Sequence, residues 1–81
     1  MARDPVTHLK ITAKMRMDRA EQKVAAIRLE LSRPSPGASR AALDRILAGR
    51  IAEAEEARRA YESLARQPDW QLAEQLAREP H

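Results

Sequence analysis

Apolar and polar residues alternate without interruption over residues 8–17, in the segment HLKITAKMRM. Every second residue is apolar, from Leu9 to Met17, and the residues between them are polar or charged. A period of two is typical of a β-strand with one buried face. The rest of the chain offers no second strand, so this segment would have to pair outside its own chain.

The period changes at Asp18, after which apolar residues recur at every third or fourth position. This spacing predicts an amphipathic helix from Asp18 to Leu31. Asp18, with Glu21 three residues later, has the spacing of a capping box, which marks the start of a helix. A helix start at this point favours a separate strand before it.

A single helix over residues 5–31 is the alternative. Val6 and Met17 also belong to a stripe with steps of three and four, and Lys, Ala and Met are helix formers. This helix would leave Ile11 and Met15 exposed on a second face, whereas alternation accounts for all five apolar residues of the segment. We therefore favour the strand.

A break follows at residues 32–39, SRPSPGAS, where two prolines, one glycine and three serines favour turns. Ser39 is expected to cap a second helix that keeps its three-four spacing to about Arg66. Pro68 ends that helix, and DWQLAEQLARE predicts a short terminal helix. The expected fold is mainly α, with an N-terminal strand, two helices and a short C-terminal helix; the alternative is an all-α helical hairpin.

The composition limits the chemistry of the chain. Eighty-one residues form one small domain, which is often marginally stable alone. No cysteine is present, and the two histidines, His8 and His81, lie at opposite ends of the sequence. We therefore expect no disulfide, metal site, cofactor or enzymatic activity, since catalysis needs grouped reactive side chains. Oligomerisation is then the way to bury more apolar surface.

No apolar run approaches the roughly 18 residues that span a bilayer, and no signal peptide is recognisable. We expect a cytoplasmic protein. Residues 1–50 carry eleven Lys and Arg against five Asp and Glu, a net charge of +6. Residues 51–81 carry four against seven, a net charge of −3, which completes the total of +3. This asymmetry suggests two surfaces with different partners.

A strand paired with its own copy in a two-fold dimer would form a ribbon that fits the major groove of DNA. The segments LKITAKMRM, DRAE, AEQKVAAIRLEL and GASRAALDRIL resemble the ribbon-helix-helix family of DNA-binding proteins, of the Arc and MetJ type, over residues 8 to about 51. The resemblance implies a homodimeric transcriptional regulator. Its DNA contacts would be Lys10, Thr12, Lys14 and Arg16 on the ribbon, with Ser39 and Arg40 at a phosphate.

By that resemblance, residues 1–51 form a dimerisation and DNA-binding domain and residues 52–81 a helical extension. In many antitoxins of toxin–antitoxin pairs such an extension wraps the toxin. The expected contacts with a protein partner are Tyr61, Trp70, Leu72 and Leu76, since tryptophan is enriched at interface hot spots. In a simpler alternative, Trp70 packs against Tyr61 or Leu64 and completes a small core.

The helical hairpin leads to another function. Such a hairpin resembles the small co-chaperones of type III secretion needle subunits, which have a similar length and shape. It would bind a partner protein and no nucleic acid, and its basic residues would form a solvated face. The conformation of residues 9–17 separates the two hypotheses.

Overall fold

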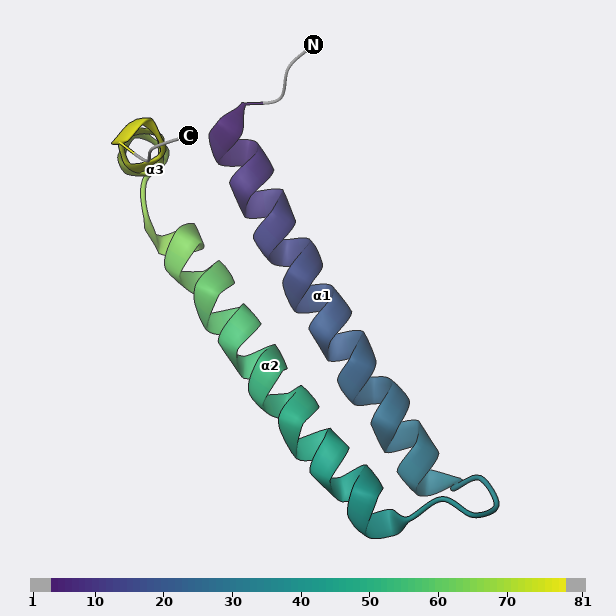
Figure 1. Cartoon of the computed structure of the whole chain (residues 1–81). Coiled ribbons are helices and arrows are strands. Elements are labelled where there is room, and N and C mark those ends of the chain that lie inside the picture. The colour runs from purple at the N-terminus through teal and green to yellow at the C-terminus, as the bar shows by residue number, and fades with distance from the viewer. Residues whose placement is uncertain (1–3, 79–81) are drawn as a thin grey trace.

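The structure, a computed structural model, describes residues 4–78 and contains three α-helices in that range. Helix α1 spans Pro5–Ser32, α2 spans Arg40–Arg66, and α3 spans Asp69–Arg78. The first two form a long antiparallel hairpin, and α3 lies at its open end beside the start of α1 (Figure 1). His81 lies outside the described residues.

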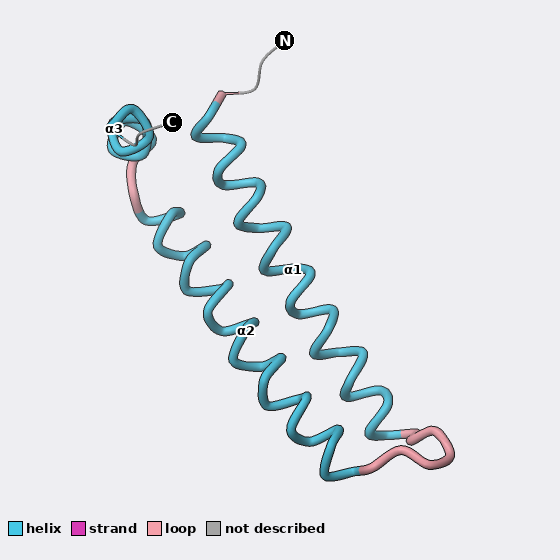
Figure 2. The backbone as a smooth tube through the Cα atoms, viewed as in Figure 1, coloured by secondary structure: helices cyan, strands magenta, loops and turns pink. Residues whose placement is uncertain are grey.

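The predicted N-terminal strand is wrong, and the alternative, an all-α hairpin, is the fold that forms. Residues 9–17 are a continuous part of α1, and no strand occurs among residues 4–78 (Figure 2). The helix begins earlier than predicted because Asp4 accepts a hydrogen bond from the Val6 N–H at 3.4 Å, with Pro5 in the first turn. A helix pairs its backbone groups within one segment, whereas a lone strand leaves them unpaired.

Asp18 does not cap a helix but lies inside α1. Its carboxylate is 3.8 Å from the Lys14 ammonium, an i,i+4 ion pair on the helix surface. Ile11 and Met15 are exposed, as the single-helix alternative requires. The alternating pattern was misleading because its apolar residues do not share one buried face: Met17 is half-buried, whereas Ile11 and Met15 are exposed.

The turn and the second helix follow the prediction. The Ser39 hydroxyl accepts a hydrogen bond from the Ala42 N–H at 3.2 Å and so caps α2. Gly37 has a φ of 84°, which suits glycine and explains the sharp turn before the cap. Helix α2 ends at Arg66, two residues before Pro68.

The hairpin buries little apolar surface. Among the described residues only four apolar side chains are buried, namely Val6, Ala20, Ala57 and Leu72. The radius of gyration is 17.3 Å, against about 12 Å for a compact chain of this length. The accessible surface is 6408 Å², roughly 1,500 Å² more than a compact protein of this mass exposes. The elongated shape thus leaves much surface available for a partner.

Candidate protein-binding surfaces

The predicted ribbon residues lie on two different sides of α1. Lys10 forms an ion pair with Asp69 of α3 at 2.6 Å, and Lys14 lies 5.9 Å from the centre of the Tyr61 ring. Thr12 and Arg16 instead line a groove on one side of the hairpin. In a helix, residues four positions apart share a face, whereas residues two positions apart point to different sides. Helix α1 therefore presents Lys10 and Lys14 on one side and Thr12 and Arg16 on another.

The other two predicted DNA contacts lie at the far end of the molecule. Ser39 and Arg40 lie at the start of α2, beside the loop that joins α1 to α2, whereas Lys10 lies in the second turn of α1, at the opposite end of that helix. About 22 residues of α1 separate these ends, which corresponds to roughly 30 Å of helix. The structure does not bring the predicted DNA contacts together.

A groove of about 590 Å³ lies between α1 and α2, and we call it the side groove. Its floor includes Ala20 and Ala57, which are both buried and both small. Small residues at facing positions let another helix approach closely, because interaxial distances depend on the side chains at the contact. The complete lining is His8, Thr12, Met15, Arg16, Arg19, Ala20, Lys23, Glu53, Glu56 and Ala57.

The two walls of the side groove carry opposite charges. The α1 wall holds the cations Arg16, Arg19 and Lys23, and the α2 wall holds Glu53 and Glu56. Within residues 4–78, none of the three cations forms an ion pair, and Glu53 pairs only with Arg50 of its own helix. The cations are therefore available to a partner.

A second groove, of about 380 Å³, lies on the opposite side of the hairpin. A hydrogen-bonded ion pair between Arg58 and Glu21, at 2.6 Å, crosses it from α2 to α1. The hydrogen bond and the negative charge of Glu21 raise the pKa of Arg58. Because this pair already joins the two walls, the second groove is less suited to a partner than the side groove.

The residues predicted for partner binding differ in exposure. Leu72 is 1% exposed and packs into the core, and Tyr61 and Leu76 are half-buried. Trp70 is 69% exposed, so the alternative in which it completes the core with Tyr61 or Leu64 is wrong. Leu72 occupies the core at this end, and Trp70 is the most exposed of the four residues predicted for partner binding.

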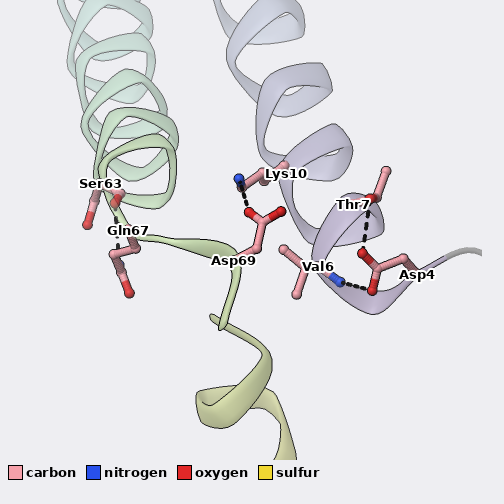
Figure 3. A network of polar contacts seen from close by, with 7 residues as sticks. All are labelled: Asp4, Val6, Thr7, Lys10, Ser63, Gln67 and Asp69. Atoms are coloured by element: carbon pink, nitrogen blue, oxygen red, sulfur yellow. Dashed lines mark hydrogen bonds and ion pairs between the residues drawn. The ribbon is translucent and has the colours of Figure 1, made fainter. Parts of the chain in front are cut away.

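A second apolar surface lies where α3 meets the start of α1. Figure 3 shows this junction, with Asp69 reaching Lys10 and Val6 close by. A hollow of about 320 Å³ is lined by Asp4, Pro5, Val6, Ala73, Leu76 and Ala77. Trp70 does not line this hollow, but it precedes Ala73 by three residues and so lies on the same side of α3. We call the surface formed by the hollow and Trp70 the end patch.

Sequence reasoning missed the charged walls of the side groove. Arg16, Arg19 and Lys23 follow each other at steps of three and four, so they had to share one flank of any helix that contains them. That signal was present in the sequence, but the strand interpretation placed Arg16 on a ribbon and did not use the other two.

Searches of protein-family models, of curated proteins and of solved structures each found no match to this chain. No group of three or more potential metal ligands occurs among residues 4–78. None of the three described helices is long and apolar enough to cross a membrane.

Proposed function

We propose that the protein is a helical-hairpin adaptor that binds a helix of a partner protein in its side groove. The observation that carries this proposal is the groove itself, with a floor of small apolar residues between walls of opposite charge. A third helix lying on Ala20 and Ala57 would turn the two-helix hairpin into a bundle. It would also cover part of the surface that the elongated chain leaves exposed.

The charges of the walls define the chemistry of the partner. A helix in the side groove would meet Arg19 and Lys23 along one flank and Glu53 and Glu56 along the other. An amphipathic helix with an acidic flank and a basic flank is therefore the best match. Such charges fix the register and speed the encounter more than they add affinity.

The available area is sufficient for a specific complex. A standard interface buries about 800 Å² on each partner, and the excess surface of this chain over a compact protein is roughly 1,500 Å². A co-chaperone role, as the resemblance of the helical hairpin to needle-subunit co-chaperones implies, is one instance of this function.

The test is recovery of the partner from the native cells with the tagged full-length protein and two matched variants. Arg19→Glu with Lys23→Glu reverses the α1 wall, and Arg45→Glu with Arg59→Glu reverses two exposed cations that do not line the groove. We expect the wild type and the second variant to retain the same stoichiometric protein and the first variant to lose it. Equal recovery with all three, or no stoichiometric partner, would contradict the adaptor function.

DNA binding is the second candidate, and the observation in its favour is the row formed by Arg16, Arg19 and Lys23, which have no ion-pair partner among the described residues. Without a ribbon, these cations would contact phosphates and not read base edges. A mobility-shift assay with the DNA upstream of the protein's own gene tests this function. Sequence-independent, strongly salt-dependent binding is expected if the row binds DNA, and no shift at low salt would exclude it.

A further inference from the structure

We propose that two copies of the chain associate through the end patch, with Trp70 of each copy seated on the hollow of the other. This inference goes beyond the proposed function, because the end patch and the side groove share no lining residue. Three observations carry it, namely the exposed indole, the adjoining hollow and the charge balance at this end of the molecule.

Helix α3 has apolar residues on both of its faces. Leu72 points into the hairpin and is buried, whereas Trp70, Ala73 and Ala77 are exposed. These three residues have the spacing i, i+3 and i+7, which places them on one side of the helix. Helix α3 therefore carries an apolar stripe that no described residue covers, with one large side chain at its beginning and small ones after it.

The stripe is complementary to itself. In a two-fold dimer, if residue i of one copy contacts residue j of the other, then residue j of the first copy also contacts residue i of the second. If two α3 helices pack antiparallel with Ala73 near the axis, each Trp70 lies over the partner's Ala77. There it adjoins the hollow formed by Pro5 and Leu76. The same surface thus supplies both the bulky anchor and the space that receives it, which is why we commit to a second copy as the occupant.

The charges at the open end allow two identical copies to meet. Lys10 pairs with Asp69 and Arg78 pairs with Glu74, both at 2.6 Å, so the ionic groups around the patch largely neutralise each other. Antiparallel α3 helices also bring ends of opposite partial charge together. The loop end of the hairpin is different. There Arg28, Arg33, Arg40 and Arg45 lie close in sequence around the turn, with only Glu30 and Asp44 among them, and would repel a second copy.

The size of the chain is consistent with this association. With four buried apolar residues in the range 4–78, the isolated hairpin is short of apolar burial. Tryptophan is among the residues that dominate interface energies when they are fully covered. Covering Trp70 and the hollow would bury the largest exposed side chain of the described structure without any change of the hairpin.

The experiment is sedimentation of the full chain from micromolar to submillimolar concentration, with the fluorescence of Trp70 recorded in the same samples. Because the chain has one tryptophan, its emission reports on this site alone. We expect a rise in mass from 9.1 kDa to twice that value, together with a blue shift of the emission. Trp70→Ala should weaken the dimer on the order of 30-fold, as a hot-spot residue does.

Two substitutions of exposed alanines give a matched comparison that does not remove the fluorophore. Ala77→Lys fills the hollow and should abolish the dimer, whereas Ala52→Lys on α2 should leave it intact. Circular dichroism is the check that both variants are folded. A chain that stays monomeric at all concentrations would overturn the proposal. The same holds if Trp70 becomes covered only when a different protein binds. A dimer that survives both Trp70→Ala and Ala77→Lys would overturn it as well.

Discussion

The attachment of α3 depends mainly on one side chain, so Leu72→Ala is the most informative perturbation of the fold. Leu72 is the only large side chain among the described residues that is fully buried, at 1% exposure. Among the described residues, the ion pair that joins α3 to the hairpin is the one between Lys10 and Asp69. Since both partners of that pair are accessible to solvent, it should contribute at most about 1 kcal/mol.

The expected loss follows from burial. Covering a leucine side chain stabilises by about 1.5–3 kcal/mol, and the cavity left by Leu→Ala brings the usual cost to about 2–5 kcal/mol. We expect about 3 kcal/mol here, because the neighbouring hollow lets the site relax. A helix of ten residues is not stable alone, so α3 should unfold locally while the hairpin stays folded.

Amide hydrogen exchange of the dilute protein, followed residue by residue, measures the local unfolding of α3. A loss of about 3 kcal/mol corresponds to a fall in protection on the order of 100-fold, confined to the amides of α3. Leu29→Ala is the matched control, because Leu29 is 68% exposed on α1 and should cost almost nothing. Unchanged protection in α3, or an equal loss throughout α1 and α2, would refute the reasoning.

Three further predictions concern the turn and the second helix. Gly49→Ala should stabilise the protein by about 0.5–1 kcal/mol in chemical denaturation, because Gly49 lies inside α2 and an added Cβ meets nothing within 4 Å. Gly37→Ala should instead destabilise by about 1 kcal/mol, since Gly37 has a φ of 84°. Hydrogen bonds from the Ser35 backbone N–H and side chain hold the pKa of Glu30 below its ordinary value. The ionised Glu30 therefore stabilises the folded state above the ordinary glutamate pKa, and this stabilisation is lost as the pH falls through the lowered pKa of the folded state. Glu30→Gln should make the free energy of unfolding fall less steeply with decreasing pH in this acidic range.

Much of the fold could be predicted from local signals. The caps and breaks that depend on one or two residues, such as Ser39 and Pro68, placed α2 and α3 correctly. The segment 9–17 could not be assigned in the same way, because its apolar residues fit a period of two and, in part, a helical stripe. The signal that marks the true start of α1 is Asp4 followed by Pro5, which lies before the alternating segment. The interpretation of Asp18 as a capping residue took precedence over this signal in the prediction.

The candidate surfaces were less predictable than the fold. Trp70 was identified from its residue type, but its exposure depends on Leu72 taking the buried position of α3, which spacing alone does not distinguish. The side groove needs the register between two helices, because Ala20 and Ala57 meet only once the hairpin closes. Sequence patterns fix which residues share a helix face, not which face of a neighbouring helix lies opposite.

The backbone conformation of residues 9–17 tests the central claim most directly. Assigned Cα and Cβ chemical shifts of the full-length protein in solution would report the conformation of each residue in the segment. A continuous α-helix from Pro5 to Ser32 predicts helical shifts throughout 9–17, with sequential amide–amide contacts and no contact between copies of this segment. Extended shifts at these residues, with backbone contacts between two chains, would contradict the hairpin and restore the DNA-binding ribbon.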